Sequence, residues 1–383
     1  MNNSKRCPYA KKCSGCQLQN LTYEEQLKMK QVKLIKLLGR FCHVDEILGM
    51  GQPEHYRNKL QAAFAHKDGR LFTGIYQSSR QAVTEVDHCM LEDIRSQKIV
   101  KSVESICREL KIKAYDIRRK SGVMRHIMVR CGASSGEIMV VLVTASYELP
   151  HKEKFVDMLI KAHPEITTVV HNVNDTDTPL FLTSKSRVLY GEGYISDSLC
   201  SLSFKISPRS FYQVNHVQTE KLYSLATELA CLTGRERVID AYCGTGTISL
   251  CMAKKAGQVL GVELSSDAVR DARDNAKING IKNAKFFCAD AGEFMTDMAE
   301  KGEKADVVIT DPPRAGCSRA FLQSLVKLSP ARVVYISCNP ETLARDLSYL
   351  TRNGYRVKRI QPVDMFPYTS HVESLVCLTK QTN

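Results

Sequence analysis

The second half of the chain alternates between short apolar segments and longer amphipathic ones, and this alternation restricts the folds that it can adopt. Arg237–Asp240, Val259–Glu263 and Ala284–Cys288 are typical of buried strands. Thr247–Lys254 and Ser266–Asn279 lie between these segments and are typical of helices. Because strands that alternate with helices build parallel sheets, we predict an α/β fold with a Rossmann-like, doubly wound and mainly parallel sheet.

The residues before this region follow another pattern, in which short strands succeed one another. Leu60–His66, Arg70–Tyr76, His126–Arg130 and Glu137–Thr144 are short and mostly alternate between apolar and polar residues. Helical segments interrupt them only occasionally. This pattern predicts an α+β region built on antiparallel strands.

The N-terminal part of the chain combines an irregular, cysteine-bearing segment with one helix. The helix is expected at Leu21–Leu38, because Thr22 and Glu25 can form a capping box and Gly39 can end it. We therefore predict an N-terminal cysteine arm, a central α+β domain and a C-terminal α/β domain, at residues 1–40, 41–206 and 207–383.

The chain is basic. It has 54 Lys and Arg residues against 41 Asp and Glu, which gives a net charge of +13. This charge favours a polyanionic partner such as nucleic acid, although charge alone is a weak argument. The strand region contains basic residues that could contact phosphates: Arg118, Arg119, Lys120, Arg125 and Arg130. An ordinary solvated charged face is an equal alternative for each of them.

No signal for a membrane or for export is visible. A run of about 18 apolar residues, which a membrane helix needs, does not occur. The start MNNSKRCPYA has no apolar core of a signal peptide. We expect a cytoplasmic protein without a membrane partner, and no obligate protein partner is evident.

A glycine turn follows one predicted strand. Val238–Leu250 has the sequence VIDAYCGTGTISL, in which Gly244 and Gly246 permit a tight turn and close approach of a ligand. Glu263 ends the next strand, where a carboxylate can bind ribose hydroxyls, and Asp290 follows the strand after it, facing the place of an adenine. Since neither a full G-x-G-x-x-G motif nor a P-loop lysine is present, S-adenosylmethionine fits better than NAD or ATP.

Three further strand-end residues suggest covalent chemistry. Cys338 follows the apolar segment VVYIS, Asp311 follows another strand, and Glu373 comes late in the chain. A thiol beside a carboxylate suits nucleophilic catalysis with a carboxylate base. The plain alternative for Cys338 is a buried thiol at the end of a strand.

Together these segments resemble the bacterial RNA uracil-C5 methyltransferases, most closely the iron–sulfur branch that acts on 23S rRNA. The matching motifs occur in family order: Phe211-Tyr-Gln-Val-Asn215, Asp240-Ala-Tyr-Cys-Gly-Thr-Gly246, Asp311-Pro-Pro-Arg-Ala-Gly316, Ser337-Cys-Asn-Pro340 and His371-Val-Glu373. The resemblance implies a class I methyltransferase fold. It also implies methyl transfer from S-adenosylmethionine to C5 of a uridine in 23S rRNA, through a covalent adduct between cysteine and C6.

The resemblance also implies a role for individual residues. Cys338 is expected to be the nucleophile and Glu373 the base. The residues expected to bind S-adenosylmethionine are Gln213, Tyr242, Glu263 and Asp311, with Asp290 as a further candidate.

Other residues near these motifs keep open interpretations. Arg314 stands where amine-methylating enzymes carry an aromatic residue, which argues against chemistry at N6 of adenine. His371 is a helper or a packed imidazole rather than the base. Phe211 or Tyr212 could stack on a flipped base, and core packing is an equal alternative.

Four of the fifteen cysteines form a pattern typical of a metal site. Cys7, Cys13 and Cys16 cluster near the start and Cys89 is remote. Four thiolates suit zinc or an iron–sulfur cluster, although zinc sites usually pair two short Cys-x-x-Cys hooks. The family resemblance implies a [4Fe–4S] cluster on these four residues, with a structural role as the minimal expectation.

The substrate is the least constrained part of this interpretation. Many family members begin with a small β-barrel RNA-binding domain, the TRAM barrel, and this sequence begins at the cysteine motif. RNA affinity is then expected from the central domain and the basic catalytic face. The same reaction on the T-loop of tRNA is the alternative, and a non-catalytic RNA-binding iron–sulfur protein is a more distant one. A cytosine-C5 enzyme is disfavoured by the context of Cys338.

Overall fold

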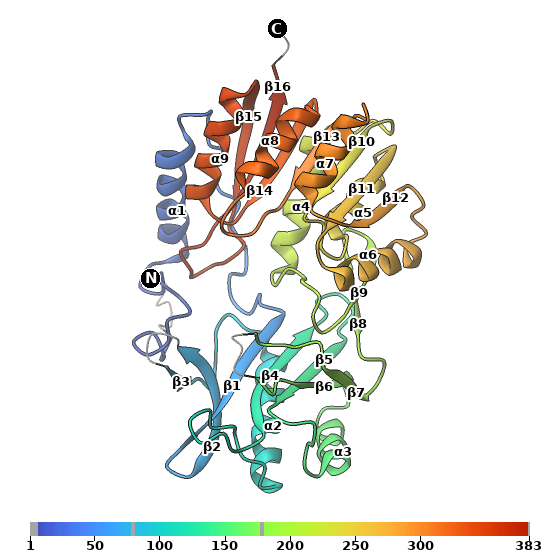
Figure 1. The fold of residues 1–383 in the computed structure, drawn as a ribbon. Helices are drawn as coiled ribbons and strands as arrows, with labels where there is room; N and C mark the ends of the chain where they lie inside the picture. Colours follow the sequence, from blue (N-terminus) through green and yellow to red (C-terminus); the bar gives the residue numbers. More distant parts are fainter. Residues whose placement is uncertain (1–6, 78–80, 177–179, 382–383) are drawn as a thin grey trace. The chain divides into compact units, whose positions relative to one another are not determined.

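The computed structural model describes residues 7–77, 81–176 and 180–381, which form two compact units (Figure 1). The first unit contains the chain up to Gln19, Gln52–Ser198 and Lys205–Arg209. The second contains Asn20–Gly51, Leu199–Phe204 and the chain from Ser210 onward. Each unit is therefore assembled from separate segments, whereas the ranges predicted from the sequence are continuous.

The first unit is built on a seven-stranded sheet with the strand order β3-β2-β1-β4-β5-β6-β7. All neighbours are antiparallel except β5 and β6, which are parallel and are connected through α3. Apolar side chains of α2 and α3 pack on one face of this sheet in a common core. The elements are β1 (Lys59–Lys67), β2 (Arg70–Gln77), β3 (Ala82–Glu85), α2 (Ile94–Glu109), β4 (Met124–Cys131), β5 (Ile138–Thr144), α3 (Lys152–Ala162), β6 (Ile166–Val173) and β7 (Ser186–Tyr190).

The second unit contains another seven-stranded sheet, with the order β12-β11-β10-β13-β14-β16-β15. The first five of these strands run parallel, and β16 is antiparallel to both of its neighbours. The strands are β10 (Arg237–Ala241), β11 (Gln258–Glu263), β12 (Ala284–Cys288), β13 (Val307–Thr310), β14 (Arg332–Ser337), β15 (Tyr355–Val363) and β16 (Glu373–Lys380). A separate two-stranded sheet consists of β8 (Ile195–Leu199) and β9 (Leu202–Ile206).

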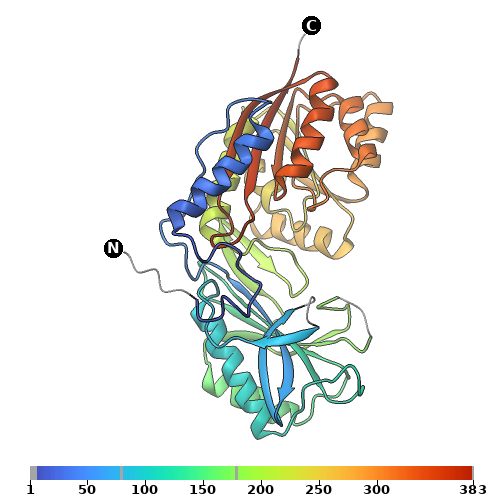
Figure 2. The same ribbon diagram turned by 90° about the vertical axis from the view of Figure 1, so that its left-hand side faces the viewer.

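Helices cover both faces of the second sheet, as Figures 1 and 2 show. Side chains of α1, α7, α8 and α9 share one core with the strands. Figure 1 shows α4, α5 and α6 on the opposite face. These helices are α4 (His216–Ala230), α5 (Thr247–Ala253), α6 (Ser266–Ile278), α7 (Ala291–Glu300), α8 (Arg319–Leu328) and α9 (Pro340–Arg352). The predicted doubly wound, mainly parallel α/β fold is therefore confirmed.

Helix α1 (Tyr23–Leu38) forms where the capping signals place it. The side chain of Thr22 accepts a hydrogen bond from the Glu25 amide, and the Glu25 carboxylate accepts one from the Thr22 amide. The helix packs beside α9 in the second unit, because Leu34 and Leu38 are fully buried in that core. It therefore belongs with the α/β sheet rather than with the cysteine segment that precedes it.

Within the part of the chain that the structure describes, no helix has the length and apolar character that a membrane span requires.

Candidate active site

The pairing of β14 with β16 brings Cys338 next to Glu373. Ser337, the last residue of β14, pairs with Ser374 of the antiparallel strand β16. Cys338 follows Ser337 and Glu373 precedes Ser374, so these two residues lie just beyond the last pair of this ladder. Strand β16 runs opposite to the parallel strands of the sheet. Its first residue, Glu373, therefore lies at the edge of the sheet where the parallel strands have their carboxyl ends.

Burial and two carboxylates raise the pKa of the Cys338 thiol. Partial burial, then Glu373 and then Asp311 raise it to about 11, and Arg314 acts in the opposite direction. Asp311 directly follows β13, the parallel neighbour of β14. The thiol, the two carboxyl groups and the guanidinium group therefore form one electrostatic unit at this edge.

Glu373 is buried and only partly satisfied. Its side chain is 4% exposed, and its atom Oε2 has no hydrogen-bond partner among the described residues. Burial and then Asp311 raise the pKa of Glu373 far above its usual range. A buried carboxyl oxygen without a partner is costly for a folded protein and is typical of a group that meets a ligand.

Arg314 and His371 border this group. Nη2 of Arg314 lies 3.2 Å from Nδ1 of His371. Since a guanidinium group only donates, Nδ1 accepts this hydrogen bond, and burial followed by Arg314 lowers the pKa of His371. The main-chain oxygen of Arg314 accepts a hydrogen bond from Asn339 Nδ2 at 3.0 Å. A neutral imidazole that accepts from an arginine is a supporting group, which agrees with the interpretation of His371 as a helper.

The glycine turn after β10 has a strained backbone. Tyr242 has a φ of 65° and Gly246 a φ of 81°, both in the left-handed region. A Cβ atom at Gly246 would lie 3.0 Å from the ring of Phe286 and 3.1 Å from Ala272. A Cβ at Gly244 would meet no atom within 4 Å. Gly246 is therefore required for packing, whereas Gly244 borders open space that a ligand could fill.

A buried acid under this turn was not singled out in the sequence. Asp240, at 1% exposure, accepts a hydrogen bond of 2.5 Å from Ser249 Oγ. Burial raises the pKa of Asp240 to about 7. Its sequence signals are the position before a glycine turn and the family motif that begins at Asp240, whereas Ser249 looks like an ordinary helical residue.

The expected S-adenosylmethionine residues surround the same edge of the sheet. Each oxygen of Glu263 accepts one backbone hydrogen bond, from Gly244 at 3.2 Å and from Ser265 at 2.8 Å. Since a carboxylate has about four acceptor positions, ribose hydroxyls could still bind there. Tyr242, Glu263, Asp290 and Asp311 follow or end the neighbouring strands β10, β11, β12 and β13.

Asp290 and Gln213 occupy different settings. Oδ1 of Asp290 caps α7 by accepting from the amides of Gly292 and Glu293, at 2.8 and 3.0 Å. Asp290 also borders an open groove between α7 and α8. Gln213 is buried, at 9% exposure, in the segment between β9 and α4. Asp290 thus has one structural role already, and its second oxygen remains for a ligand.

The two aromatic candidates for stacking on a base differ in exposure. Phe211 is 65% exposed, whereas Tyr212 is 4% exposed and lies 6.5 Å from Phe204, measured between ring centres. Tyr212 is therefore a core residue, and Phe211 is the ring that a base could reach.

The structure also separates the basic candidates. Arg118, Arg119 and Lys120 are exposed. Arg125 donates to the main-chain oxygens of Asn174 and Thr176, and Arg130 is 3% exposed. The alternative of an ordinary solvated face therefore does not hold for Arg125 and Arg130, because both guanidinium groups donate to main-chain oxygens of the protein.

The four cysteines of the predicted cluster converge without forming a metal site. Thiol groups of Cys7 and Cys13 raise the pKa of Cys16, and Cys16 raises that of Cys89, in each case in addition to burial. However, among residues 7–77, 81–176 and 180–381, no three His, Cys, Asp or Glu side chains are arranged to hold a metal ion. Four thiols have the donor chemistry of an iron–sulfur cluster, but the described side chains are not arranged as its ligands. The cluster therefore stays a prediction.

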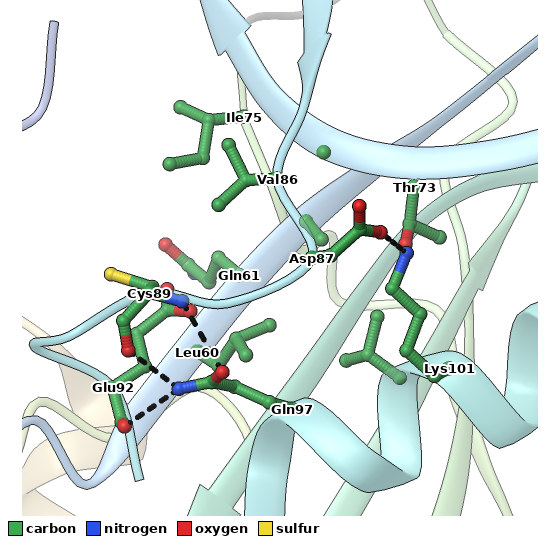
Figure 3. A pocket seen from close by; sticks show the side chains of 13 residues that line it. Leu60, Gln61, Thr73, Ile75, Val86, Asp87, Cys89, Glu92, Gln97 and Lys101 are labelled. Carbon is green, nitrogen blue, oxygen red and sulfur yellow. Dashed lines mark hydrogen bonds and ion pairs between the residues drawn. The ribbon is translucent and has the colours of Figure 1, made fainter. Parts of the chain in front are cut away.

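A hydrogen-bonded side chain fixes the segment that carries Cys89. Figure 3 shows Gln97 of α2 reaching the main chain of Cys89 and Glu92. Gln97 Nε2 donates to their oxygens at 2.6 and 2.9 Å, and the Cys89 amide donates back to Gln97 Oε1 at 3.2 Å. The cavity beside them has a volume of about 20 Å³. That volume suits about one water molecule, so the cavity is no substrate pocket.

Comparisons with known proteins show the family to which the chain is similar. Residues 22–381 match the sequence family described as tRNA (Uracil-5-)-methyltransferase. An uncharacterized RNA methyltransferase of Halalkalibacterium halodurans is 44% identical over 377 residues, covering 97% of this chain and 82% of the relative. Another, from Staphylococcus aureus, is 41% identical over 375 residues, with 96% and 83% covered.

A solved structure is similar over nearly the whole chain. It is a Pyrococcus abyssi tRNA (uracil-54, C5)-methyltransferase in complex with S-adenosyl-L-homocysteine. The two chains are 30% identical and superpose with a TM-score of 0.82, covering 96% of this chain and 86% of the other.

Proposed function

Because the chain belongs to the tRNA (uracil-5-)-methyltransferase family, we propose that it methylates C5 of a uridine in 23S rRNA through a covalent adduct with Cys338. The methyl donor is S-adenosylmethionine, whose product is bound in the similar Pyrococcus abyssi enzyme. The observation that carries the proposal is the proximity of Cys338 and Glu373, which lie just beyond the last pair of β14 and β16. This function belongs to a cytoplasmic enzyme with an RNA substrate.

The first step is attack by the thiolate of Cys338. C5 of uracil is a poor nucleophile, and a bond between sulfur and C6 converts the ring into an enolate that can react at C5. The thiol first gives its proton to solvent, and Arg314 favours the resulting thiolate because its positive charge lowers the pKa of Cys338. The electron pair of the C5–C6 double bond is delocalised onto the carbonyl oxygen at C4, which carries the enolate charge.

The second step is methyl transfer. S-adenosylmethionine supplies the methyl group as a sulfonium, and C5 forms the new bond as the bond between sulfur and methyl breaks. Glu263 and Asp311 at the strand ends suit the ribose and the charged end of this donor. The open space beside Gly244 supports a close approach of the donor to the turn.

The last step is removal of the C5 proton by Glu373. Its carboxylate takes the proton, the C5–C6 double bond forms again, and the bond between sulfur and C6 breaks. Formation of the adduct removes the thiolate charge beside Glu373, so the carboxyl group ionises more readily at the stage where a base is needed. A positioned base contributes about 10²–10⁴-fold to the rate.

The iron–sulfur cluster is part of this proposal. Cys7, Cys13, Cys16 and Cys89 supply four thiols, and the mutual influence on their pKa values supports their proximity. No reaction step involves the cluster, because methyl transfer to uracil moves no electrons. Its role would be to connect the N-terminal segment to the sheet of the first unit.

Transfer RNA is the second candidate substrate. It is supported by the family description and by the substrate named for the Pyrococcus abyssi enzyme. The cysteine pattern, typical of the ribosomal branch that the sequence resembles, favours 23S rRNA. The chemistry at Cys338 is the same for both.

The test compares unmodified 23S rRNA and tRNA transcripts with labelled S-adenosylmethionine, followed by mapping of the methylated base. We expect 5-methyluridine in 23S rRNA and little product in tRNA. Product in tRNA alone would refute the ribosomal assignment and keep the reaction. Absence of product in both would refute the proposed activity.

Two substitutions test the covalent step. Cys338→Ala should abolish methylation and keep S-adenosylhomocysteine binding, because the thiol acts on the base. Glu373→Gln should accumulate a protein–RNA adduct on a denaturing gel, since the C5 proton cannot leave. Cys231→Ala is a matched control, because Cys231 is an exposed thiol at the end of α4. Full activity of Cys338→Ala would overturn the mechanism.

A further inference from the structure

Two basic side chains lie directly opposite each other in the first unit. Lys59, at the start of β1, pairs with Arg130 of the antiparallel strand β4. Opposite residues in antiparallel strands point to the same face of the sheet, and like charges there destabilise the sheet. This arrangement is therefore costly for the free protein unless an anion joins it.

The pair lies on the face of the sheet opposite to the helices. Leu60 and Ala62 of β1 and Val129 of β4 belong to the core with α2 and α3. Because side chains alternate between the two faces of a strand, Lys59 and Arg130 point to the other face. Main-chain oxygen of Ser207 accepts a hydrogen bond of 3.4 Å from Arg130 Nη1, which fixes this guanidinium group on that face.

Arg57 adds a third positive charge. It precedes Lys59 by two residues, and its charge is near enough to lower the pKa of Lys59. Burial, Arg130 and Arg57 all lower the pKa of Lys59, to about 8, and no carboxylate of the described residues offsets them. Arg57 itself has acidic neighbours, because its charge lowers the pKa of both Glu92 and Cys16. The site thus combines three cations with partial exclusion of water and lacks an anion at Lys59.

We propose that Lys59, flanked by Arg57 and Arg130, binds a phosphate group of the RNA substrate. A phosphate would neutralise the repulsion and gain strength from the partly buried setting, where charges interact more strongly than in water. Arg130, which is too buried to meet solvent freely, would act as a fixed charge and Lys59 as the contacting group. This inference rests on the proposed RNA substrate, and it names a contact within the strand domain.

The test measures RNA binding separately from methylation. Binding of unmodified 23S rRNA and tRNA transcripts is measured by filter retention over a range of salt concentrations. Lys59→Met should weaken binding by about tenfold and reduce the slope of log affinity against log salt by about one, as loss of one phosphate contact does. Lys59→Arg should restore most of the affinity. Lys67→Met is a matched control, because Lys67 is exposed at the other end of the same strand.

A second readout separates binding from folding. Removal of Lys59 relieves a repulsion, so Lys59→Met should melt at the same temperature as the wild type or higher. Inorganic phosphate should raise the melting temperature of the wild type more than that of Lys59→Met. A purely structural lysine would give the opposite result, with a lower melting temperature.

The outcomes distinguish this inference from the proposed function. Unchanged affinity and salt slope in Lys59→Met, or an equal loss in Lys67→Met, would overturn the phosphate site while methylation persists. Weakened binding of both transcripts by Lys59→Met, with an unchanged methylated position, would support it. A wild-type protein that binds neither transcript would refute the proposed function itself.

Discussion

The ammonium group of Lys30 lies 2.6 Å from Oδ1 of Asp364, and both side chains are almost completely buried. Lys30 also donates to the main-chain oxygen of Phe366 at 3.1 Å, and the Tyr23 hydroxyl donates to the other oxygen of Asp364 at 2.9 Å. Helix α1 is thereby attached to the segment that connects β15 to the start of β16. That segment leads directly to His371 and Glu373.

Replacement of Lys30 by Met should strongly destabilise the second unit. The substitution leaves a buried carboxylate without its cation, and breaking a buried pair in this way costs about 3–5 kcal/mol. The free energy of unfolding from urea denaturation measures this loss.

Two controls identify the cause. Lys33→Met removes an exposed ion pair with Glu341 from the same helix and should cost less than about 1 kcal/mol. The double variant Lys30→Met/Asp364→Leu removes both charges and should recover much of the stability. Equal losses for Lys30→Met and Lys33→Met would show that the buried pair has no special weight.

Much of the α/β fold could be predicted because the sequence pattern is local. The strand at Ala284–Cys288 forms with the bounds that its apolar run indicates. The capping box at Thr22 and Glu25 likewise fixes the start of α1, since the signal lies within one turn.

The remaining features depend on contacts that are distant in sequence. Asp364 lies 334 residues from Lys30, so no local pattern shows that α1 joins the α/β sheet. The helices α7 and α8 were not specified, although both lie in the expected alternation. The proximity of Cys338 and Glu373 depends on the antiparallel direction of β16, which an alternating pattern does not distinguish from a parallel one. The burial of Arg130 could likewise not be predicted from the sequence, because it results from the residues that fold around β4.

The reactivity of Cys338 should increase with pH across the neutral range. Its pKa is raised to about 11, so the thiolate fraction grows about tenfold for each pH unit well below that value. Alkylation by iodoacetamide, followed at this residue by mass spectrometry, should accelerate accordingly between pH 7 and about 9. A rate that is constant over this range would indicate a thiolate with a low pKa.

Arg314→Gln should slow the same alkylation. The guanidinium group favours the thiolate, and its removal raises the pKa of Cys338 further. We expect a decrease of a few fold at pH 8, measured at Cys338. Arg319→Gln on α8 is the control and should leave the rate unchanged, and an equal decrease in both variants would contradict the specific effect of Arg314.

A comparison of two glycines tests the turn that is proposed to hold the methyl donor. Gly246→Ala and Gly280→Ala both place alanine at a positive φ, of 81° and 64°, which costs roughly 1–2 kcal/mol. Only Gly246→Ala also presses a Cβ against Phe286 and Ala272, which adds about 1–3 kcal/mol of overpacking. Calorimetric binding of S-adenosylhomocysteine should weaken only in Gly246→Ala. Similar losses of stability and binding in both variants would mean that the packing at Phe286 has no role.

The final prediction concerns the cysteines of the first unit. Protein purified without oxygen should be brown and contain about four iron atoms per chain, because four thiolates suit a [4Fe–4S] cluster. Serine at Cys7, Cys13, Cys16 or Cys89 should abolish the absorbance and increase proteolysis of the N-terminal segment, since each thiol is one ligand. Cys42→Ser and Cys107→Ser serve as controls and should keep the iron, because neither belongs to the four. Elemental analysis decides between the metals: one zinc and no iron would replace the cluster by a zinc site, and absence of both metals would leave the four thiols with a packing role alone.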